Sequence, residues 1–524
     1  MKRKRGQFDF DVAIIGGGSG GYAAARTAAA AGLKTVVIEG GAEVGGLCIL
    51  RGCMPTKALL YAAEVKHLAE HAETWGVRAG KVTFDFAKVM ARKGAQVKDF
   101  ADYRVQQLNA GKFKFIRASA KFLDAHTVEL NSHRSSGRES APSDQSRLTS
   151  AAAITAKHFV IATGSTVAPP PLPQLNEVGF ITSDDAVALK KLPKSLIILG
   201  GGAIACEFAQ FFARFGVKVA LIQRSEHILK EFDTDAATEI KKVFRREGIQ
   251  VFTDTKLLGA QIVGQASSRS KQPLKRKMNR LEACPTIKEI SFKHGGKTTS
   301  ISAEEILFAL GRIPNTASLD LENAGVKTEG GYVATNDKMQ TSAPHIFAAG
   351  DCTGPHEIVH IAVTQGEIAA HNIVGGASVP ASRNLAASSN GSRGRSPHRM
   401  DHRLLISVVF TEPQVAFVGL TEKEAAARKI PFLAASYPFN DHGKSLIMEA
   451  KDGFVKLLAN PKTGEILGGA CVGPSGGELI HEIVAAMAKR MTVHELAATP
   501  HYHPTLAEIW TYPAEELAGK ISQK

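Results

Sequence analysis

The chain has 524 residues, of which 44% are hydrophobic and 22% are charged. A chain of this length is expected to form about three or four structural units, and its composition excludes general disorder. The 49 glycines and the aromatic content of 6% favour an α/β protein with tight glycine turns over an aromatic-rich β-sandwich. No run of about 18 apolar residues occurs, which predicts that the chain has no membrane span.

The net charge of +14 is concentrated in four polar segments. Residues 2–5 carry +4, residues 131–150 carry +1, residues 264–285 carry +5 and residues 377–403 carry +4, so the rest of the chain is neutral. Solvated surface loops are the simpler interpretation, and weak, salt-sensitive contact with anionic surfaces is the alternative. Because none of these segments holds a chemical motif, we expect no nucleic-acid partner.

The first informative stretch, residues 11–39, has the order strand, glycine turn, helix and strand. The turn has the pattern G-x-G-x-x-G, whose glycines permit close approach of a pyrophosphate to a helix N-terminus. An acid ends the second strand, where it would accept hydrogen bonds from ribose hydroxyls. We therefore predict strands over 11–15 and 35–38, a helix over 22–31, and Gly16, Gly18, Gly21 and Glu39 as dinucleotide-binding residues.

The same unit recurs over residues 195–224, with a glycine turn that contains Gly200 and Gly202 and has Ala205 in the third glycine position. Two dinucleotide sites in one chain predict a flavin and a nicotinamide that exchange hydride. The second strand ends in Gln223-Arg224 instead of an acid. An arginine can bind a 2′-phosphate that a carboxylate would repel, so we expect NADPH to be preferred over NADH. The alternative is that Arg224 is only a solvated surface residue.

Two further glycine turns follow apolar strands, at residues 159–165 and 345–351, and the second ends in an acid. After residue 404 the pattern changes, because the runs 404–410 and 454–458 alternate as antiparallel strands do. Helical segments then continue to the end. The C-terminal part is therefore predicted to be a separate α+β domain.

The stretch Gly45–Lys57 contains two of the six cysteines, Cys48 and Cys53. Cys53 lies just before a predicted helix, whose dipole would stabilise a thiolate. Cys48 is close enough in sequence to form a disulfide with it. Two buried thiols or half of a metal site are the alternatives, but zinc would need two more close ligands and none follows nearby. We therefore predict a redox disulfide and no metal.

A second cluster, residues 501–508, places His503 five residues before Glu508. A carboxylate bonded to one imidazole nitrogen fixes the tautomer and raises the basicity of the other nitrogen. Such a pair on its own is more often structural. His501 is interpreted as a structural residue or as one that supports the pair.

With these motifs together, the chain resembles the flavoprotein disulfide reductases, a family that includes dihydrolipoyl dehydrogenase, glutathione reductase and mercuric reductase. The resemblance covers nearly the whole chain outside the basic segments. It is highly specific for the superfamily and poorly specific for the substrate. It rests on both glycine fingerprints, the cysteine motif at 45–57, A-T-G at 162–164, the motif at 311–315, G-D at 350–351, F-T-E-P at 410–413 and H-P-T-x-x-E at 503–508.

The resemblance implies an α/β fold with two Rossmann-like dinucleotide-binding domains and a C-terminal α+β dimerisation domain. It implies a homodimer, which we expect to be cytoplasmic. The expected domains are an FAD-binding domain over 8–167 with a surface insertion at 131–150, an NAD(P)-binding domain over 168–310 with an insertion at 264–285, a second FAD-binding part over 311–376, a low-complexity linker over 377–403 and the dimerisation domain over 404–524.

The resemblance also implies a mechanism in which electrons pass from NAD(P)H through FAD to a Cys48–Cys53 disulfide. Cys53 would be the thiol next to the flavin, and Cys48 would exchange with the substrate disulfide. His503 would supply and accept protons, oriented by Glu508. The implied cofactor-binding residues further include the ion pair Lys57–Glu207 near the flavin, Asp351 at the ribityl chain, and Thr163, Gly164 and Gly311.

Several departures from the family limit the choice of substrate. The chain has no C-terminal cysteine pair, which puts mercuric reductase and the large thioredoxin reductases in doubt. Ala203 stands where glutathione reductases have a tyrosine lid. Dihydrolipoyl dehydrogenase is the nearest activity, and the substrate is expected to be a small-molecule or protein disulfide. The alternative is an NAD(P)H-dependent flavin reductase of a quinone, a metal ion or another electron acceptor.

Overall fold

The computed structural model describes residues 8–131, 152–265, 286–376 and 398–521, and every structural statement below concerns these residues. The predicted basic insertions therefore lie almost entirely outside the described part. The chain forms two compact units. Unit 1 comprises Met1–Pro55, Gly94–Ala168 and Arg312–Met400, and unit 2 comprises Thr56–Lys93, Pro169–Gly311 and Asp401–Lys524.

These units divide the chain differently from the predicted domains, because the predicted NAD(P)-binding and dimerisation domains fall in one unit. Residues 56–93, which we assigned to the flavin-binding domain, cluster with unit 2. The end of the predicted linker 377–403 is hydrogen-bonded, since the His398 N–H donates to Asn372 Oδ1 and the Met400 N–H donates to the Asp337 carbonyl. The other domain boundaries stay predictions.

Unit 1 is built on a parallel sheet, and its strands at 10–15, 35–39 and 346–348 are short, apolar and mostly buried, as expected for a sheet covered on both faces. Its order is β3-β2-β1-β6-β18, and β6 continues into an antiparallel ladder with β5 and β4. The strands are β1 (Phe10–Ile15), β2 (Thr35–Glu39), β3 (Lys114–Arg117), β4 (Ser119–Phe122), β5 (Thr127–Asn131), β6 (Ala152–Ile161) and β18 (Ile346–Ala348).

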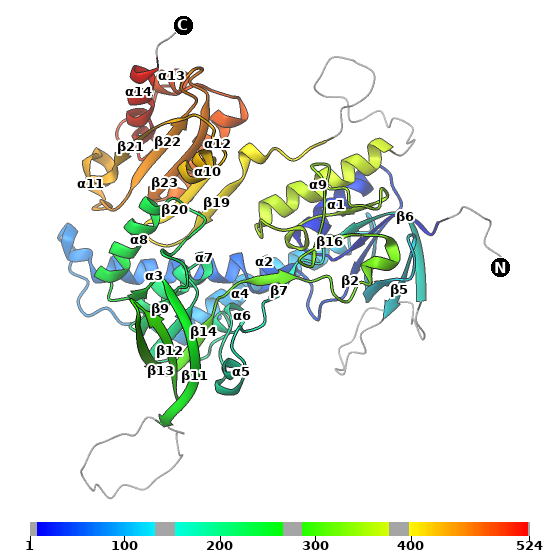
Figure 1. Ribbon diagram of the computed structural model, residues 1–524, viewed down its shortest axis with the longest axis horizontal. Coiled ribbons are helices and arrows are strands. Elements are labelled where there is room, and N and C mark those ends of the chain that lie inside the picture. Colours follow the sequence, from blue (N-terminus) through cyan, green and yellow to red (C-terminus); the bar gives the residue numbers. More distant parts are fainter. Residues whose placement is uncertain (1–7, 132–151, 266–285, 377–397, 522–524) are drawn as a thin grey trace, which may run out of the picture. The chain divides into compact units, whose positions relative to one another are not determined.

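Two helices of unit 1, α1 (Ser19–Ala30) and α9 (Val359–Gly376), lie side by side (Figure 1). Glycines permit this approach, because a Cβ on Gly366 would lie 2.2 Å from the Gly20 carbonyl oxygen. The smaller elements are α2 (Gly46–Leu50), β7 (Ser165–Val167), β15 (Arg312–Pro314), η2 (Leu321–Ala324), β16 (Thr328–Glu329), β17 (Tyr332–Val333) and η3 (Asp351–Thr353), while α3 (Cys53–Glu70) and α4 (Phe86–Leu108) contribute residues to both units.

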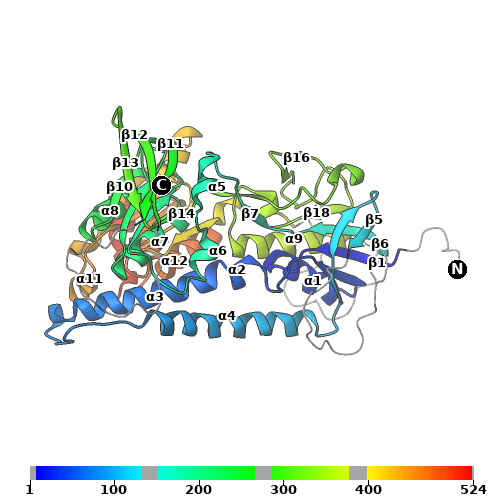
Figure 2. The ribbon, with the colours of Figure 1, turned by 90° about the horizontal axis from the view of Figure 1, so that it is seen from below.

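Unit 2 contains a second parallel sheet, of order β10-β9-β8-β14. A separate antiparallel sheet, β11-β12-β13, lies beside α5 (Figure 2). The elements are α5 (Gln174–Val178), α6 (Ser183–Ala186), β8 (Ser195–Leu199), α7 (Ala203–Arg214), β9 (Lys218–Ile222), α8 (Thr234–Arg246), β10 (Gln250–Phe252), β11 (Thr255–Gln265), β12 (Thr286–His294), β13 (Lys297–Ala303) and β14 (Glu305–Phe308), with η1 (Ala72–Trp75) earlier in the chain.

The C-terminal part of unit 2 is a five-stranded antiparallel sheet, β19-β20-β23-β22-β21, with helices packed on it, as the alternating sequence pattern predicts. Trp510 is completely buried in this core. The elements are η4 (His402–Leu404), β19 (Ile406–Val409), β20 (Gln414–Gly419), α10 (Glu422–Ala427), β21 (Leu433–Pro438), η5 (Phe439–Asp441), α11 (Gly443–Ile447), β22 (Phe454–Ala459), β23 (Ile466–Gly473), α12 (Gly476–Ala488), α13 (Val493–Ala497), η6 (Ala507–Trp510) and α14 (Thr511–Lys520).

Candidate active site

The first glycine turn joins β1 to α1 in unit 1. Gly16 has a φ of +108°, and a Cβ there would lie 2.2 Å from the Ala162 carbonyl oxygen, so only glycine fits. The N-cap of α1 is Gly18, which has no side chain, and the first turn of the helix holds no acidic residue. The N–H groups at this helix end are therefore open to an anion such as a phosphate.

Glu39 ends β2 and is tied to the glycine turn by its carboxylate. Its Oε2 accepts a hydrogen bond from the Gly17 N–H at 2.8 Å, and its Oε1 accepts one from the Gly41 N–H at 2.6 Å. A Cβ on Gly17 would lie 3.1 Å from Glu39 Oε2, so the glycine makes room for the acid. The structure thus brings together the residues predicted for the first dinucleotide site.

A second group in unit 1 surrounds Asp351. Asp351 Oδ2 accepts a hydrogen bond from the Ser165 hydroxyl at 2.7 Å, and Arg312 donates to both the hydroxyl and the carbonyl oxygen of Ser165 at 2.8 Å. Within the described residues, the buried hydroxyl of Thr163 has no hydrogen-bond partner. Next to it, Gly164 has a φ of +72° and open space where a Cβ would point. A polar group from a ligand would satisfy the Thr163 hydroxyl.

The two cysteines of the predicted redox pair are both half-buried in unit 1. Cys48 lies on α2, and Cys53 is the first residue of α3, a helix of 18 residues with no acid in its first turn. Gly52 closes the chain tightly between them, because a Cβ there would lie 3.2 Å from the Cys48 Cα. The start of a long helix favours the thiolate form of Cys53.

Arg104, on α4, was not singled out from the sequence. Its guanidinium lies 4.1 Å from the centre of the Tyr22 ring, and its Nε and Nη1 are buried without a hydrogen-bond partner in the described structure. Burial lowers the pKa of Arg104, while Coulomb interactions with Tyr22 and Cys48 act in the opposite direction. A cation near Cys48 would stabilise its thiolate.

The second glycine turn joins β8 to α7 in unit 2. Gly200 has a φ of +119°, and a Cβ there would lie 2.2 Å from the Ala309 carbonyl oxygen, as at the first turn. Gly202 is the N-cap of α7, whose first turn also lacks acids. At the end of β9, Gln223 is buried against the turn, whereas Arg224 is exposed. Gly311, another predicted residue of unit 2, has a φ of +115° and open space where a Cβ would point.

The predicted ion pair forms in unit 2, where Lys57 Nζ lies 2.9 Å from Glu207 Oε2. The Glu207 side chain is 3% exposed, and its Oε1 accepts a hydrogen bond from the Phe410 N–H at 2.9 Å. Lys57 Nζ also lies 4.6 Å from the centre of the Phe410 ring. These contacts fix the ammonium group at one wall of a cavity of about 190 Å³.

The same cavity is lined by Glu412, which belongs to the F-T-E-P motif but was not predicted as a site residue. Gln210 holds its backbone with two hydrogen bonds of 2.7 Å, one to the carbonyl oxygen and one from the N–H. Burial, with a further contribution from Glu64, raises the pKa of Glu412 to about 8. Glu412 is therefore largely protonated at neutral pH.

His503 and Glu508 also come together, with 2.9 Å between His503 Nδ1 and Glu508 Oε2. The His503 side chain is 77% exposed and that of Glu508 is 12% exposed. The other oxygen, Oε1, lies 3.4 Å from Nε2 of His442, whose Nδ1 is 2.8 Å from the Ser445 hydroxyl. Burial lowers the pKa of His442, which is neutral at pH 7. His501 pairs instead with Glu482 at 2.6 Å.

Comparisons with known proteins agree with this geometry. The family model for pyridine nucleotide-disulphide oxidoreductases matches residues 10–366, and the model for the dimerisation domain of the same family matches residues 405–514. Among curated proteins, dihydrolipoyl dehydrogenase of Bacillus subtilis is 33% identical over 98% of this chain and 98% of its own length. The chain belongs to the class I pyridine nucleotide-disulfide oxidoreductases.

Other members of this oxidoreductase family are similar over nearly the whole chain. Mercuric reductase of Bacillus cereus is 31% identical over 96% of this chain and 70% of its own length. The crystal structure of LpdA from Mycobacterium tuberculosis has a TM-score of 0.79 and 24% identity, covering 97% of this chain and 99% of that one. The Cu(II) complex of the HOCl-induced flavoprotein disulfide reductase RclA from Escherichia coli has a TM-score of 0.77, with 24% identity, 97% of this chain and 100% of that chain covered. The two structures support the predicted mixed α/β fold.

The residues of unit 1 fit FAD, the cofactor expected for this oxidoreductase family. The open helix end at Gly18 can bind phosphates, and the Glu39 carboxylate can accept hydrogen bonds from ribose hydroxyls. The Thr163 hydroxyl, which has no partner among the described residues, can form a hydrogen bond with a polar atom of the flavin ring or of its side chain. The dimerisation-domain match supports a homodimer. Among the described side chains, no cluster of three or more His, Cys, Asp or Glu could hold a metal ion. No helix in that part of the chain is long and apolar enough to cross a membrane.

Proposed function

We propose that this oxidoreductase is an FAD-dependent NAD(P)H:disulfide oxidoreductase, similar to dihydrolipoyl dehydrogenase, that acts on a small-molecule or protein disulfide through Cys48 and Cys53. The observation that carries the proposal is the hydrogen bond between His503 and Glu508, which orients an exposed imidazole. Thiol–disulfide exchange needs a group that delivers and removes protons. Direct reduction of a quinone by a flavin needs no such pair.

FAD, when bound, supplies a two-electron carrier that accepts hydride from NAD(P)H. The proposed work of the protein is then thiol chemistry. The Cys48 thiolate attacks one sulfur of the substrate disulfide, which forms a mixed disulfide and releases one substrate thiolate. The His503 imidazolium protonates that leaving group. The Cys53 thiolate next attacks the sulfur of Cys48 and releases the second substrate thiolate, so the protein dithiol is oxidised as the substrate is reduced.

Three side chains support the proposed proton transfer at His503. Glu508 accepts the Nδ1–H of His503 and leaves Nε2 free to exchange a proton with a thiol. His442 and Ser445 lie behind Glu508 and restrict how its carboxylate can turn. The active unit of the proposal is a cytoplasmic homodimer, in which His503 of one subunit serves the cysteines of the other, as the family resemblance implies.

NADPH is the proposed nicotinamide nucleotide. Arg224 is exposed two residues after the end of β9, near the place where an NAD-binding site has an acid. Its guanidinium can form charge-assisted hydrogen bonds with a 2′-phosphate. Gln223 supports this position, because its Oε1 accepts the Arg224 N–H at 3.1 Å.

A substrate panel tests the proposal. We expect the purified protein to oxidise NADPH with lipoamide or glutathione disulfide, and Cys48→Ser to abolish both reactions. A quinone should still be reduced by Cys48→Ser, because that reaction bypasses the thiols. Disulfide turnover that survives in Cys48→Ser, or turnover of the quinone alone by the wild-type protein, would establish the flavin reductase alternative instead.

A further inference from the structure

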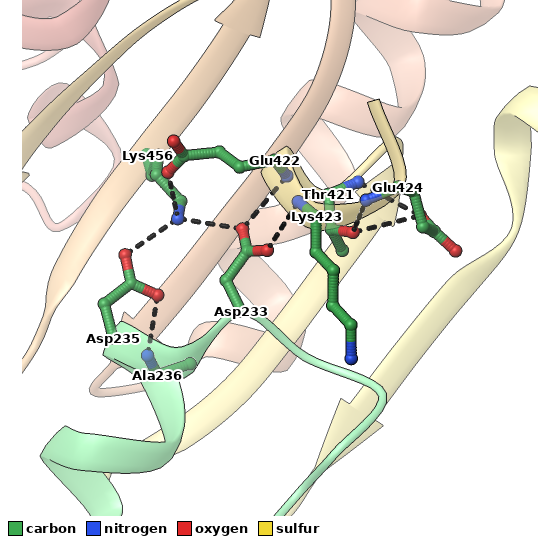
Figure 3. A network of polar contacts seen from close by, with 8 residues as sticks. All are labelled: Asp233, Asp235, Ala236, Thr421, Glu422, Lys423, Glu424 and Lys456. Carbon is green, nitrogen blue, oxygen red and sulfur yellow. Dashed lines mark hydrogen bonds and ion pairs between the residues drawn. The ribbon is translucent and has the colours of Figure 1, made fainter. Parts of the chain in front are cut away.

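Lys456 is a charged side chain buried in the C-terminal sheet of unit 2. It lies on β22, and its side chain is 4% exposed. Its Nζ is 2.9 Å from Asp233 Oδ2 and 2.7 Å from both Asp235 Oδ2 and Glu422 Oε1 (Figure 3). Burial alone would lower the pKa of Lys456, but the hydrogen bonds to the three carboxylates raise it above its ordinary value. The ammonium group therefore stays charged and holds all three acids.

Two of these acids belong to the nucleotide-binding part of unit 2. Asp233 is the N-cap residue of α8, and Asp235 lies in the first turn of that helix. The Asp233 carboxylate also accepts hydrogen bonds of 3.2 Å from the backbone N–H groups of Glu422 and Lys423, at the start of α10. Asp233 thus joins α8 to the C-terminal part of the chain by three contacts (Figure 3).

Asp233 is also the last residue of the loop 223–233, which begins at the end of β9 and carries Arg224. In the middle of this loop, the buried Leu229 has a φ of +50°, and its N–H donates to the Gly201 carbonyl oxygen at 2.7 Å. Near its end, the Phe232 ring packs edge-on against Phe417 of the C-terminal sheet, with 4.9 Å between ring centres. The loop is therefore held at the glycine turn on one side and at the C-terminal sheet on the other.

The contacts at the C-terminal sheet depend on one cation. Without the Lys456 ammonium, Asp233 would be left partly buried near two further carboxylates, those of Asp235 and Glu422, which now share the same cation. Neighbouring like charges repel one another. Asp233 would then have to move towards solvent, and the loop that ends at this residue would move with it. Lys456 and Asp233 are 223 residues apart in the sequence, so the loop is held at its end by a long-range contact.

We propose that Lys456 is a positioning residue for the nicotinamide nucleotide. By fixing Asp233, it fixes the 223–233 loop and hence the presentation of Arg224, so that both affinity for NADPH and discrimination against NADH depend on the C-terminal domain. This inference rests on the proposed role of the second glycine turn and Arg224 in nucleotide binding.

The test is direct binding of NADP⁺ and NAD⁺ to the flavin-loaded protein, with thermal unfolding measured in parallel. Arg246→Met is a matched control, because Arg246, at the other end of α8, also pairs with a residue near β22, Asp452, with 3.0 Å between Nη1 and Oδ1. That pair is more exposed and does not touch the loop. We expect Lys456→Met to raise the Kd for NADP⁺ by about tenfold or more, and to bring the two nucleotides closer in affinity, as for a coupling between distant sites.

Lys456→Arg should restore most of the NADP⁺ affinity, and Arg246→Met should leave it within about twofold of the wild type. If Lys456→Met does not fold, Asp233→Asn carries the same test, because Asp235 and Glu422 still neutralise the lysine. A lower melting temperature with unchanged Kd values for both nucleotides would overturn the positioning role of Lys456 and leave the proposed nucleotide site intact. Failure of the wild-type protein to bind either nucleotide would overturn the second dinucleotide site and, with it, the proposal.

Discussion

The two glycine turns of the chain have the same backbone but different strand ends. At the two turns the first glycine has a φ of +108° and +119°, and a Cβ would lie 2.2 Å from the carbonyl oxygen of the residue that follows the neighbouring strand. At the first turn, Glu39 folds back and accepts the Gly17 N–H. At the second, Gln223 fills that space and Arg224 is directed to the exposed surface. The scaffold is therefore common to both, and the residue at the end of the second strand distinguishes them.

This difference shows how one folding pattern can serve two dinucleotides within a chain. The shared steric demand explains why glycines recur at the same positions of the turn. The electrostatic difference concerns the side chains at the strand ends: Glu39 accepts a hydrogen bond from the first turn, whereas Gln223 packs against the second turn and leaves Arg224 exposed. Variants that change the turns, the strand ends and the thiol chemistry separately test this distinction.

The largest effect is expected from a variant that leaves both turns intact. His503→Gln removes the proposed proton carrier, and general acid–base groups contribute about 10²–10⁴-fold in rate. We expect disulfide reduction to slow by that factor, while stopped-flow reduction of the flavin by NADPH stays within about twofold. Equal slowing of both half-reactions would show that His503 acts structurally.

The next largest effect is expected for Arg224, near the end of the strand that packs beside the second glycine turn, and concerns the preference for NADPH. Hydrogen bonds to charged groups contribute about 1.5–3 kcal/mol, so Arg224→Glu should remove a preference for NADPH of roughly 10–100-fold in kcat/KM. Lys218→Glu is the control, because it reverses the same charge at the opposite end of β9. Equal use of NADPH and NADH by the wild-type protein would contradict the role of Arg224.

The two turns can be compared directly with Gly18→Ala and Gly202→Ala. A Cβ at Gly18 would have only the Gly46 Cα within 4 Å, at 3.9 Å, and a Cβ at Gly202 would meet open space. Because neither methyl group would clash with the protein, we attribute any weaker binding to contact between the added methyl group and the bound cofactor. We expect about tenfold weaker flavin binding for Gly18→Ala and about tenfold weaker NADP⁺ binding for Gly202→Ala.

Gly94→Ala is the control for this pair, because it adds the same methyl group to open space on α4. All three variants should unfold within a few degrees of the wild-type protein, and Gly94→Ala should bind both cofactors normally. Loss of flavin from Gly202→Ala would show that the two turns do not bind separate dinucleotides.

A smaller effect is expected for His442, which lies next to Glu508, the partner of His503. His442→Leu removes a polar neighbour whose Nε2 lies 3.4 Å from Glu508 Oε1, and the loss of such a contact is expected to cost about 1 kcal/mol or less, at most several-fold in rate. We expect the pH profile of disulfide reduction to shift, while quinone reduction stays unchanged. If the two reactions fall in parallel, His442 serves only the packing of the C-terminal sheet.

The smallest effect is expected from the basic segments, which hold the net charge and none of the motifs of either turn. Shortening residues 266–285 and 378–397 should leave flavin content and turnover within about threefold, since long surface insertions are tolerated. Residues 398–403 are kept because Met400 and Arg403 are hydrogen-bonded. A colourless or inactive product would mean that one of these segments is required for the fold.

Local patterns predicted much of this arrangement. Both glycine turns follow the predicted strands, and Cys53 begins a helix because Pro55 suits a first turn and apolar residues follow. The family resemblance implied the Lys57–Glu207 ion pair, which joins residues far apart in the sequence. Other long-range contacts follow from no local pattern, such as the hydrogen bond between Ser165 and Asp351, which are 186 positions apart. The same holds for His442 beside Glu508, since no spacing or motif connects the two residues.

The most direct measurement is the location of the electrons after one equivalent of NADPH has been added without oxygen. Burial raises the pKa of the other described thiols, Cys206, Cys352 and Cys471, so brief alkylation under native conditions should spare them. We expect Cys48 and Cys53 to become alkylated only after reduction, as identified by mass spectrometry. Oxidation of NADPH with no change in the alkylation of this pair would contradict a disulfide reductase mechanism.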